Sequence, residues 1–269
     1  MKIAQVVSTY PPYRGGMGKV AFEYTERLRA LEHSVHVYTP KYREVKDDPD
    51  YVHRISSPIH VGNAGVVPSL FNRMKGFDIV HLHYPFFGGA EPVIIRKALR
   101  KDQALVMTYH MDAVADGFRG AVFNMHRRML FPWLASRADK ILVSSLDYAE
   151  SSALANIENI FDCVEELPFG VELDRFFPGD EFGLKVELGI PIEEPVMIFV
   201  GGLDAAHHFK GLPVIFDALE HLRELKWHFV IVGSGELKES FKAQAQAKGF
   251  EDRIHFAGNV SSEDLPRYY

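Results

Sequence analysis

Short runs of aliphatic residues alternate with segments of helical hydrophobic spacing through the first part of the chain. Residues 3–7 are mostly apolar, as expected for a strand that is covered on both faces. Apolar residues then recur at positions 20, 24, 28 and 31, which is the spacing of an amphipathic helix. The alternation continues with strands expected at 35–38, 79–82, 104–108 and 141–143, less regular strands at 52–55 and 164–167, and helices at 92–100, 118–135 and 146–155. This order predicts a parallel, doubly wound α/β sheet with right-handed crossovers.

The alternation restarts after a connector at 168–178 that is rich in proline, glycine and phenylalanine. A strand at 196–200, a helix with apolar residues at 212, 215, 219 and 222, and a strand at 227–232 follow. Gly233-Ser234-Gly235 then precedes a helix that runs to about 248 and a strand at 254–257. We therefore expect two domains, 1–175 and 176–269, each built on a parallel sheet.

Composition narrows the class of protein. The 269 residues carry a net charge of −6, which gives no general attraction for nucleic acid. Cys163 is the only cysteine, so no disulfide forms within the chain and a reducing compartment fits. The chain starts in an apolar strand without a signal-peptide pattern, and no apolar run approaches the roughly 18 residues of a membrane span. These features predict a soluble, cytoplasmic protein with no nucleic-acid partner.

Two strand–glycine–helix junctions carry the candidate chemistry. Gly15 and Gly16 precede the first expected helix, and Gly202 follows the strand at 196–200, with Lys210 further along the same junction. N–H groups at the start of a helix bind anions, and glycines let a diphosphate approach the backbone closely. The pattern predicts a phosphate-bearing ligand held in a cleft between the two domains.

Two histidines follow strands of the first sheet. His83 comes after the strand at 79–82, and His110 comes after the strand at 104–108. Because ligands bind beyond the carboxyl ends of parallel strands, we expect both histidines to face the same crevice as the first glycine junction.

Spacing excludes the competing motifs. Gly18-Lys19 lacks the preceding glycine and the following Ser or Thr of a Walker loop, and neither junction reads Gly-x-Gly-x-x-Gly. His81 and His83 point the same way from one strand, but no third ligand follows at a metal-binding spacing. We expect neither a metal ion nor a cofactor.

The motifs occur in a characteristic order: Tyr10-Pro11-Pro12, Gly15-Gly16, Val80-His81-Leu82-His83, Thr108-Tyr109-His110, Phe169-Gly170-Val171-Glu172, Val200-Gly201-Gly202-Leu203-Asp204, Phe209-Lys210-Gly211 and Val232-Gly233-Ser234-Gly235. In this order and spacing the chain resembles the retaining, nucleotide-sugar-dependent glycosyltransferases of family 4 over nearly its whole length. The resemblance implies the GT-B architecture, in which two Rossmann-like domains face each other. It also implies transfer of a sugar from a nucleoside diphosphate sugar to an acceptor with retention of the anomeric configuration.

The sequence departs from the family pattern in two places. Many relatives have an arginine at the position of Gly202, so Lys210 and backbone amides are expected to hold the donor diphosphate without it. The family's pair of glutamates that contact the donor sugar and ribose would fall beyond Tyr269. We therefore expect the second Rossmann-like domain to be incomplete.

The resemblance implies roles for individual residues. Gly15 and Gly16 match the loop that closes over the donor phosphate, and Gly202 lies at the second phosphate-binding junction. His110 matches a histidine that reaches the transferred sugar. Lys210 matches the cation that compensates the negative charge growing on the departing diphosphate. Lys210 and His110 are thus the expected catalytic residues.

Other residues are expected on the acceptor side. His83 is expected to border it, with simple loop packing as the alternative. Glu172 lies where relatives often have aspartate, and we expect it to form hydrogen bonds between the domains. The expected helix at 118–135 carries Arg127, Arg128 and Met129. It is either a membrane-surface face for a lipid acceptor or a solvated crossover helix.

The function expected from these observations is metal-independent transfer from a nucleotide sugar to an unidentified acceptor. The alternatives are a fragment that binds ligand without catalysis, and another GT-B enzyme such as a sugar epimerase or phosphorylase. The usual order of a Rossmann-like sheet also leaves the apolar strand at 196–200 with one open edge. We therefore expect the 269-residue chain to self-associate.

Overall fold

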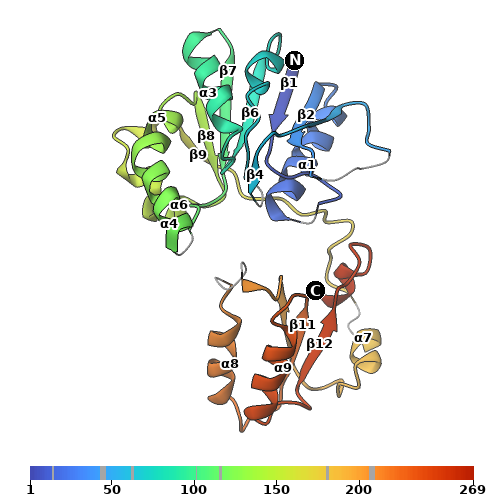
Figure 1. Ribbon diagram of the computed structural model, residues 1–269. Coiled ribbons are helices and arrows are strands. Elements are labelled where there is room, and N and C mark those ends of the chain that lie inside the picture. The colour runs from blue at the N-terminus through green and yellow to red at the C-terminus, as the bar shows by residue number, and fades with distance from the viewer. Residues whose placement is uncertain are drawn as a thin grey trace. The chain divides into compact units, whose positions relative to one another are not determined.

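The computed structural model describes residues 1–13, 15–42, 47–61, 64–100, 102–114, 117–179, 182–205 and 210–269. The chain forms two compact units, Met1–Phe169 and Gly170–Tyr269 (Figure 1). The division falls earlier than the predicted boundary at 175 and 176. Phe169 belongs to the first unit because its ring stacks on that of His110.

The first unit is built on a parallel sheet of seven strands in the order β3-β2-β1-β6-β7-β8-β9 (Figure 1). The strands are β1 (Lys2–Val6), β2 (Ser34–Pro40), β3 (Val52–Ile55), β6 (Ile79–Tyr84), β7 (Ala104–Tyr109), β8 (Lys140–Val143) and β9 (Val164–Glu166). A short antiparallel hairpin, β4 (His60–Val61) and β5 (Ala64–Gly65), lies apart from this sheet. The strand order reverses at β1, and the predicted parallel α/β sheet is confirmed.

The crossover segments of the first unit are helical where the sequence predicted helices. They are α1 (Gly16–Ala30), α2 (Leu70–Arg73), α3 (Ala90–Leu99), α4 (Gly117–Met125), α5 (Phe131–Ala135) and α6 (Leu146–Ser151), with 3-10 turns at Ala153–Asn156 and Ile160–Asp162. The predicted helix at 118–135 differs in detail, because a π-helical stretch, His126–Leu130, separates α4 from α5. Phe131 of this segment is buried in the core. Among the described helices, none is both long and apolar enough to cross a membrane.

The second unit is a parallel sheet of three strands in the order β10-β11-β12, with β10 (Val196–Val200), β11 (His228–Val232) and β12 (Ile254–Gly258). Its helices are α7 (Phe182–Glu187), α8 (Leu212–Glu220) and α9 (Lys238–Ala247), and a 3-10 turn at Leu265–Tyr268 follows. The predicted strand order is confirmed. All five residues of β11 are buried, whereas all five of β10 are only partly buried. Within the described residues β10 pairs with β11 alone, so its other edge carries no strand.

Two glycines allow the loops of the second unit to approach each other. A Cβ atom on Gly233 would lie 1.8 Å from the backbone oxygen of Gly201, and a Cβ on Gly235 would lie 2.2 Å from the backbone of Leu203. Gly233 also has φ of +149°, a conformation that other residues rarely adopt. The Gly-Ser-Gly motif after β11 is therefore required by the packing of the strand ends.

Candidate active site

The first glycine junction lies beyond the carboxyl end of β1, at the start of α1. Gly15 is the residue before the helix, with an extended backbone and no side-chain cap. The first turn of α1 contains no acidic residue, and the N–H of Lys19 donates to the carbonyl of Gly15. Within the described residues the preceding N–H groups of this turn have no such acceptor, and an uncapped helix start of this kind can bind phosphate.

The glycines of this junction are not equivalent. A Cβ on Gly18 would lie 2.8 Å from the backbone oxygen of Thr9, so the close approach of α1 to the preceding loop requires glycine there. Gly16 has no atom within 4 Å of such a Cβ, and Gly15 would meet Tyr13 at an ordinary 3.6 Å. The fold therefore requires Gly18, which the sequence analysis did not single out. It leaves Gly15 and Gly16 as bare backbone at the helix start.

His110 follows β7 and hydrogen-bonds to His83 of β6. Nε2 of His110 lies 3.0 Å from Nδ1 of His83, and the two rings stack with centroids 5.3 Å apart. The His83 side chain is fully buried, whereas His110 is partly exposed. His83 is thus the buried partner of His110, and the expectation that His83 borders the acceptor stays a prediction.

A buried polar layer extends from these histidines across the central strands. Nε2 of His83 lies 2.9 Å from Oε1 of Gln5 on β1, and Nε2 of His81 lies 2.7 Å from the hydroxyl of Thr108. Tyr24 of α1 stacks on the His81 ring at 5.7 Å. Burial lowers the pKa of His81 to about 3, with a further contribution from His110. All the side chains of this layer on β1 and β6 are nearly inaccessible to solvent.

Burial also keeps His110 and His83 neutral. It lowers the pKa of His110 to about 4, and it holds the pKa of His83 well below its usual range, with contributions from the two neighbouring histidines. On its other side His110 stacks against Phe169 with ring centroids 5.6 Å apart. The sequence analysis missed Phe169 and Gln5 as neighbours of the histidines. A single polar residue in the apolar strand at 3–7 was the available signal for Gln5.

The second junction holds Lys210 across the end of β10. Nζ of Lys210 donates to the backbone oxygen of Val200 at 3.0 Å. A Cβ on Gly201 would lie 2.7 Å from the Lys210 side chain, so the absence of a side chain at Gly201 makes room for the lysine. Gly202 follows as partly buried backbone. Phe209, part of the motif that singled out this lysine, lies outside the described residues.

Glu172 lies at the start of the second unit and pairs with Arg175 at 3.4 Å. Arg175 also donates to the backbone oxygen of Ser262, so the pair ties the connector to the segment after β12. The hydrogen bonds between domains that we expected of Glu172 stay a prediction. The shared cleft stays a prediction as well, because Gly15, Gly16 and His110 belong to one unit and Gly202, Lys210 and Glu172 to the other.

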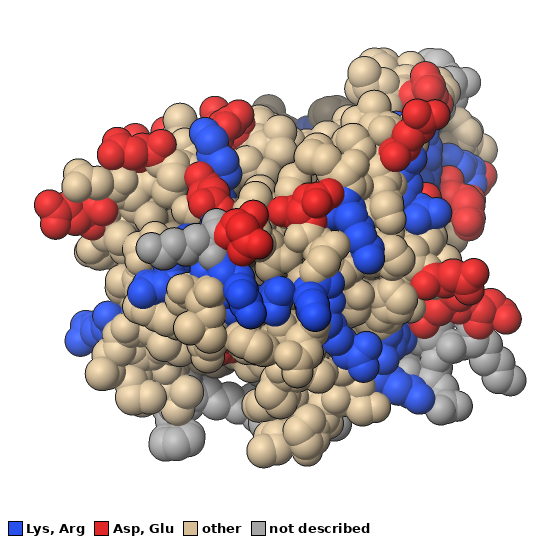
Figure 2. Space-filling model, turned by 90° about the horizontal axis from the view of Figure 1, so that it is seen from above, with Lys and Arg blue, Asp and Glu red and all other residues tan. Residues whose placement is uncertain are grey.

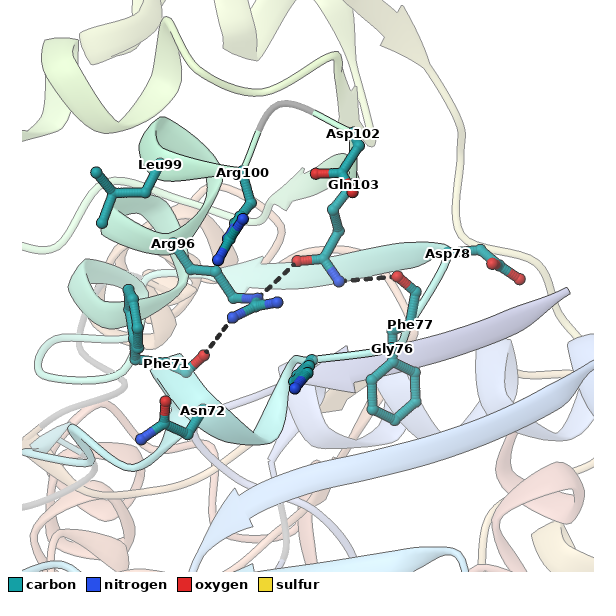
Figure 3. Close-up of a pocket in the computed structure, with 11 residues that line it drawn as sticks. Phe71, Asn72, Gly76, Phe77, Asp78, Arg96, Leu99, Arg100, Asp102 and Gln103 are labelled. Atoms are coloured by element: carbon teal, nitrogen blue, oxygen red, sulfur yellow. Dashed lines mark hydrogen bonds between the residues drawn. The ribbon is translucent and has the colours of Figure 1, made fainter.

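A separate pocket of about 910 Å³ opens at the amino ends of β6 and β7 (Figure 3). These strand ends lie uppermost in Figure 1, and Figure 2 shows Lys and Arg side chains in a band across that side of the molecule. Inside the pocket Arg96 donates to the side chain of Gln103 at 3.2 Å and to the backbone oxygen of Phe71 at 3.1 Å. The carboxylates of Asp78 and Asp102 also line it. Arg96 thus forms hydrogen bonds within the fold, and none of the predicted site residues lines this pocket.

Within the described part of the chain, no group of three or more His, Cys, Asp or Glu side chains is arranged to hold a metal ion. The described groups able to meet the charge of a phosphate are, each in its own unit, the helix N-terminus at Gly16 and the ammonium group of Lys210.

Comparison with known proteins places the chain among glycosyltransferases. The profile of Glycosyltransferase Family 4 matches residues 14–175, and that of Glycosyl transferases group 1 matches residues 181–269. A D-inositol 3-phosphate glycosyltransferase of Xylanimonas cellulosilytica is 28% identical over 220 residues, covering 77% of this chain and 51% of the relative. The chain thus spans about half the length of that relative.

Two further proteins are similar over the whole chain. A GDP-mannose-dependent alpha-(1-6)-phosphatidylinositol monomannoside mannosyltransferase of Mycobacterium tuberculosis is 25% identical, with 100% of this chain and 70% of the relative covered. The crystal structure of Anabaena HepE in complex with UDP-glucose superposes with a TM-score of 0.69 at 16% identity, covering 100% of this chain and 71% of that one. The fold is therefore that of the GT-B glycosyltransferases, and the chain belongs to Glycosyltransferase Family 4.

Proposed function

We propose that this protein transfers a sugar from a nucleoside diphosphate sugar to an acceptor with retention of the anomeric configuration. Membership of Glycosyltransferase Family 4 supports the class of reaction. A nucleotide-sugar donor is supported by the GDP-mannose-dependent relative and by the similar structure that holds UDP-glucose. The residues of the two junctions supply the chemistry that such a donor needs.

The observation that carries this proposal is the position of the Lys210 side chain across the end of β10. Its Nζ is anchored 3.0 Å from the Val200 oxygen, and the bare backbone of Gly201 lets the side chain lie across the strand end. An ammonium group has three donors, and the described residues engage one of them, in the bond to Val200, which leaves two for a phosphate oxygen. When the bond between sugar and diphosphate breaks, negative charge grows on the diphosphate. A cation already held in position stabilises that charge without reorganisation.

The first junction provides backbone N–H donors for the phosphate, and Gly15 and Gly16 have no side chains to block them. The uncapped start of α1 presents its first-turn amides beside Gly15 and Gly16. The positive end of the helix dipole favours an anion there by about 0.3–1 kcal/mol. Together with Lys210 and the backbone at Gly202, these groups compensate the diphosphate charge without a metal ion. His110 then contacts the transferred sugar, and the acceptor attacks on the face from which the diphosphate departs.

The test is donor turnover by the Lys210→Ala variant. Loss of one preorganised donor to a developing charge lowers turnover by about 100-fold or more. Lys242→Ala is the matched control, because Lys242 is a surface lysine of the same unit that pairs with Glu239 at 2.9 Å. Equal turnover by wild type and Lys210→Ala would contradict the proposal.

Product analysis separates the alternatives. Nuclear magnetic resonance of the product shows whether the anomeric configuration of the donor is kept. An epimerase would change the sugar without an acceptor, and a phosphorylase would need orthophosphate. A chain that only binds ligand would show donor affinity with no product. D-inositol 3-phosphate and phosphatidylinositol monomannoside are the first acceptors to test, because two similar proteins are named for them.

We further propose that one face of the helical segment at 117–135 contacts a lipid surface that carries the acceptor. Val122, Met125 and Met129 recur at helical spacing and are 39%, 58% and 75% exposed, and the neighbouring Arg128 is exposed too. Exposed apolar residues beside a cation are typical of a helix that lies on an anionic membrane. Co-sedimentation with vesicles rich in anionic lipid should be lost in Met125→Gln/Met129→Gln. Unchanged sedimentation would favour the ordinary solvated face.

We also propose that the 269-residue chain self-associates through β10. Its five residues are apolar, partly exposed and paired on one side only within the described residues. An open apolar strand edge offers a template for pairing with another chain. Light scattering should show a mass that rises with concentration and falls when Ile198, a central residue of β10, is replaced by lysine. A stable monomer with strong hydrogen-exchange protection of β10 would contradict this proposal.

A further inference from the structure

Gln5, His83 and His110 form one line of hydrogen bonds from the centre of the sheet to its carboxyl edge. Oε1 of Gln5 lies 2.9 Å from Nε2 of His83, and Nδ1 of His83 lies 3.0 Å from Nε2 of His110. Gln5 and His83 are both fully buried. Each member of the line comes from a different strand or strand end, namely β1, β6 and the residue after β7.

Gln5 lowers the stability of the fold unless its side chain has a function. It lies in an otherwise apolar stretch, and its Nε2 is buried without a hydrogen-bond partner. A buried polar group without a partner destabilises a protein by about 1–3 kcal/mol. An apolar residue at this position of β1 would avoid that cost. The benefit of the glutamine must therefore come from its other atom, Oε1, which accepts from His83.

The direction of each hydrogen bond follows from Gln5. An amide oxygen only accepts, so Nε2 of His83 carries the hydrogen that it donates to Gln5. In a neutral imidazole the other nitrogen has no hydrogen, so Nδ1 of His83 is an acceptor. Nε2 of His110 must then be the donor to His83. The hydrogen of His110 is thereby placed on Nε2, and its Nδ1 keeps a free lone pair.

We propose that Gln5 and His83 are positioning residues that fix His110 as the Nε2–H tautomer, so that its Nδ1 accepts a hydrogen bond from a hydroxyl group of the bound sugar. This proposal rests on the proposed function of His110. In the part of the chain that the structure describes, Nδ1 of His110 has no hydrogen-bond partner of its own. His110 is also the partly exposed member of the line, whereas Gln5 and His83 are fully buried.

The surroundings hold the rings in place. His110 is stacked between His83 on one side and Phe169 on the other, with centroids at 5.3 Å and 5.6 Å. His83 is in turn stacked on His81 at 4.7 Å. Burial lowers the pKa of each of the three histidines, so all three are neutral near pH 7. Because the ring is neutral, the tautomer decides which nitrogen of His110 donates a hydrogen bond and which one accepts.

A similar pair in the same unit provides the control. Nδ1 of His36 lies 3.0 Å from Nε2 of His53, and the rings stack at 5.3 Å. This pair lies near the amino ends of β2 and β3, at the opposite end of the sheet from His110. His36→Asn therefore removes the same kind of contact without touching the line from Gln5 to His110.

The test is ¹⁵N nuclear magnetic resonance of the 269-residue chain labelled at histidine, recorded near pH 7. Long-range ¹⁵N–¹H correlations give the tautomer of each ring, and His83→Asn and His110→Asn identify the signals. We expect the Nε2–H tautomer at both His83 and His110, unchanged in His36→Asn. In Gln5→Leu the acceptor is lost, and an Nδ1–H population should appear at His110. Gln5→Glu keeps an acceptor and should restore the Nε2–H form.

Turnover separates failure of this proposal from failure of the proposed function. Gln5→Leu should lower kcat about tenfold, the effect of one lost hydrogen bond of about 1.4 kcal/mol, with KM unchanged and with recovery in Gln5→Glu. An Nδ1–H or charged His110 in the wild-type chain would overturn the proposal even if His110→Asn abolished turnover. The expected tautomers together with full turnover by His110→Asn would instead refute the role of His110 in the proposed function and with it the sugar contact.

Discussion

The two glycine junctions of this chain share a pattern of strand, glycine and helix but use their glycines differently. In the first unit the fold requires Gly18, whose Cβ would lie 2.8 Å from a backbone oxygen, and leaves Gly16 in open space. In the second unit the fold requires Gly233, while Gly201 makes room for the side chain of Lys210. A glycine-rich turn therefore mixes glycines that the packing requires with glycines at which the packing would accept a side chain. The contacts that a Cβ atom would make at each position distinguish these two groups of glycines.

The junctions also differ in what lies behind them. The unit of the first junction also contains His81, His83 and His110, which are neutral at pH 7 because burial lowers their pKa. The second presents the ammonium group of Lys210, which donates to the backbone oxygen of Val200. The first unit thus offers neutral donors and acceptors with fixed direction, and the second offers charge.

The largest expected difference between the units is in their response to acid. The folded pKa values of His81 and His110, about 3 and about 4, lie below the ordinary value of 6.5, and that of His83 is well below it. Below pH 6.5 the unfolded state binds protons that the folded state excludes. The contribution of each histidine is therefore complete above pH 6.5 and is lost progressively as the pH falls from 6.5 towards its folded pKa.

Hydrogen exchange followed by mass spectrometry measures this effect unit by unit. Peptides from β6 and β7 should lose protection between pH 6.5 and 4.5, after correction for the intrinsic exchange rate, well before peptides from β11. In the second unit the related pair, His228 and His255 at 2.9 Å, has Glu194 as a hydrogen-bond partner at 3.1 Å. Burial lowers the pKa of His255 in this pair, but three histidines of the central strands are affected in the first unit, so the second unit should tolerate acid better. Equal loss of protection in both units would contradict the comparison.

The next largest effect is expected for Gly233→Ala. A Cβ 1.8 Å from the Gly201 oxygen, on a backbone with φ of +149°, forces the ends of β10 and β11 apart. Overpacking and backbone strain together should lower the free energy of unfolding of the second unit by at least about 3 kcal/mol. Urea denaturation followed by the fluorescence of Trp227 in a Trp133→Phe background measures it. Gly201→Ala is the milder companion, because the atoms in its way belong to the flexible end of Lys210.

In the first unit, Gly18→Ala and Gly16→Ala should separate stability from ligand binding. Gly18→Ala should lower the free energy of unfolding by about 1–3 kcal/mol, because its Cβ meets the backbone of Thr9. Gly16→Ala meets no atom and should leave the stability unchanged or slightly raised, since alanine favours a helix over glycine by up to about 1 kcal/mol. Thermal unfolding measures both. If the two variants were equally unstable, Gly16 would be a packing residue and its place in the phosphate site would be lost.

The parts of the structure that depend on local pattern were predictable from the sequence. Both sheets, the order of β10, β11 and β12, and the position of each junction at a strand end follow from hydrophobic spacing and short glycine motifs. The surroundings of His83 were not predictable in this way. Its burial and its bond to Gln5 depend on how β1 and β6 align, and residues 78 positions apart meet there. The distinction between Gly16 and Gly18 likewise depends on the path of the loop at Thr9.

The domain boundary shows the same limit. Proline and glycine in the connector indicated that a boundary was near, but not which unit each residue joins. Phe169 joins the first unit through its contact with His110, whereas Glu172 and Arg175 join the second through the contact with Ser262. These assignments depend on side-chain contacts between distant segments, which hydrophobic spacing does not encode.

Calorimetric titration with nucleoside diphosphates tests the central proposal most directly. UDP, GDP and ADP are each titrated into the wild-type chain and into Lys210→Ala, with the matching nucleosides as controls. A charge-assisted bond to phosphate is worth about 1.5–3 kcal/mol, so Lys210→Ala should raise the Kd of the bound diphosphate about 10- to 100-fold and leave nucleoside binding unchanged. The same Kd for wild type and Lys210→Ala would show that this lysine does not hold the diphosphate, and the proposed donor site would be refuted.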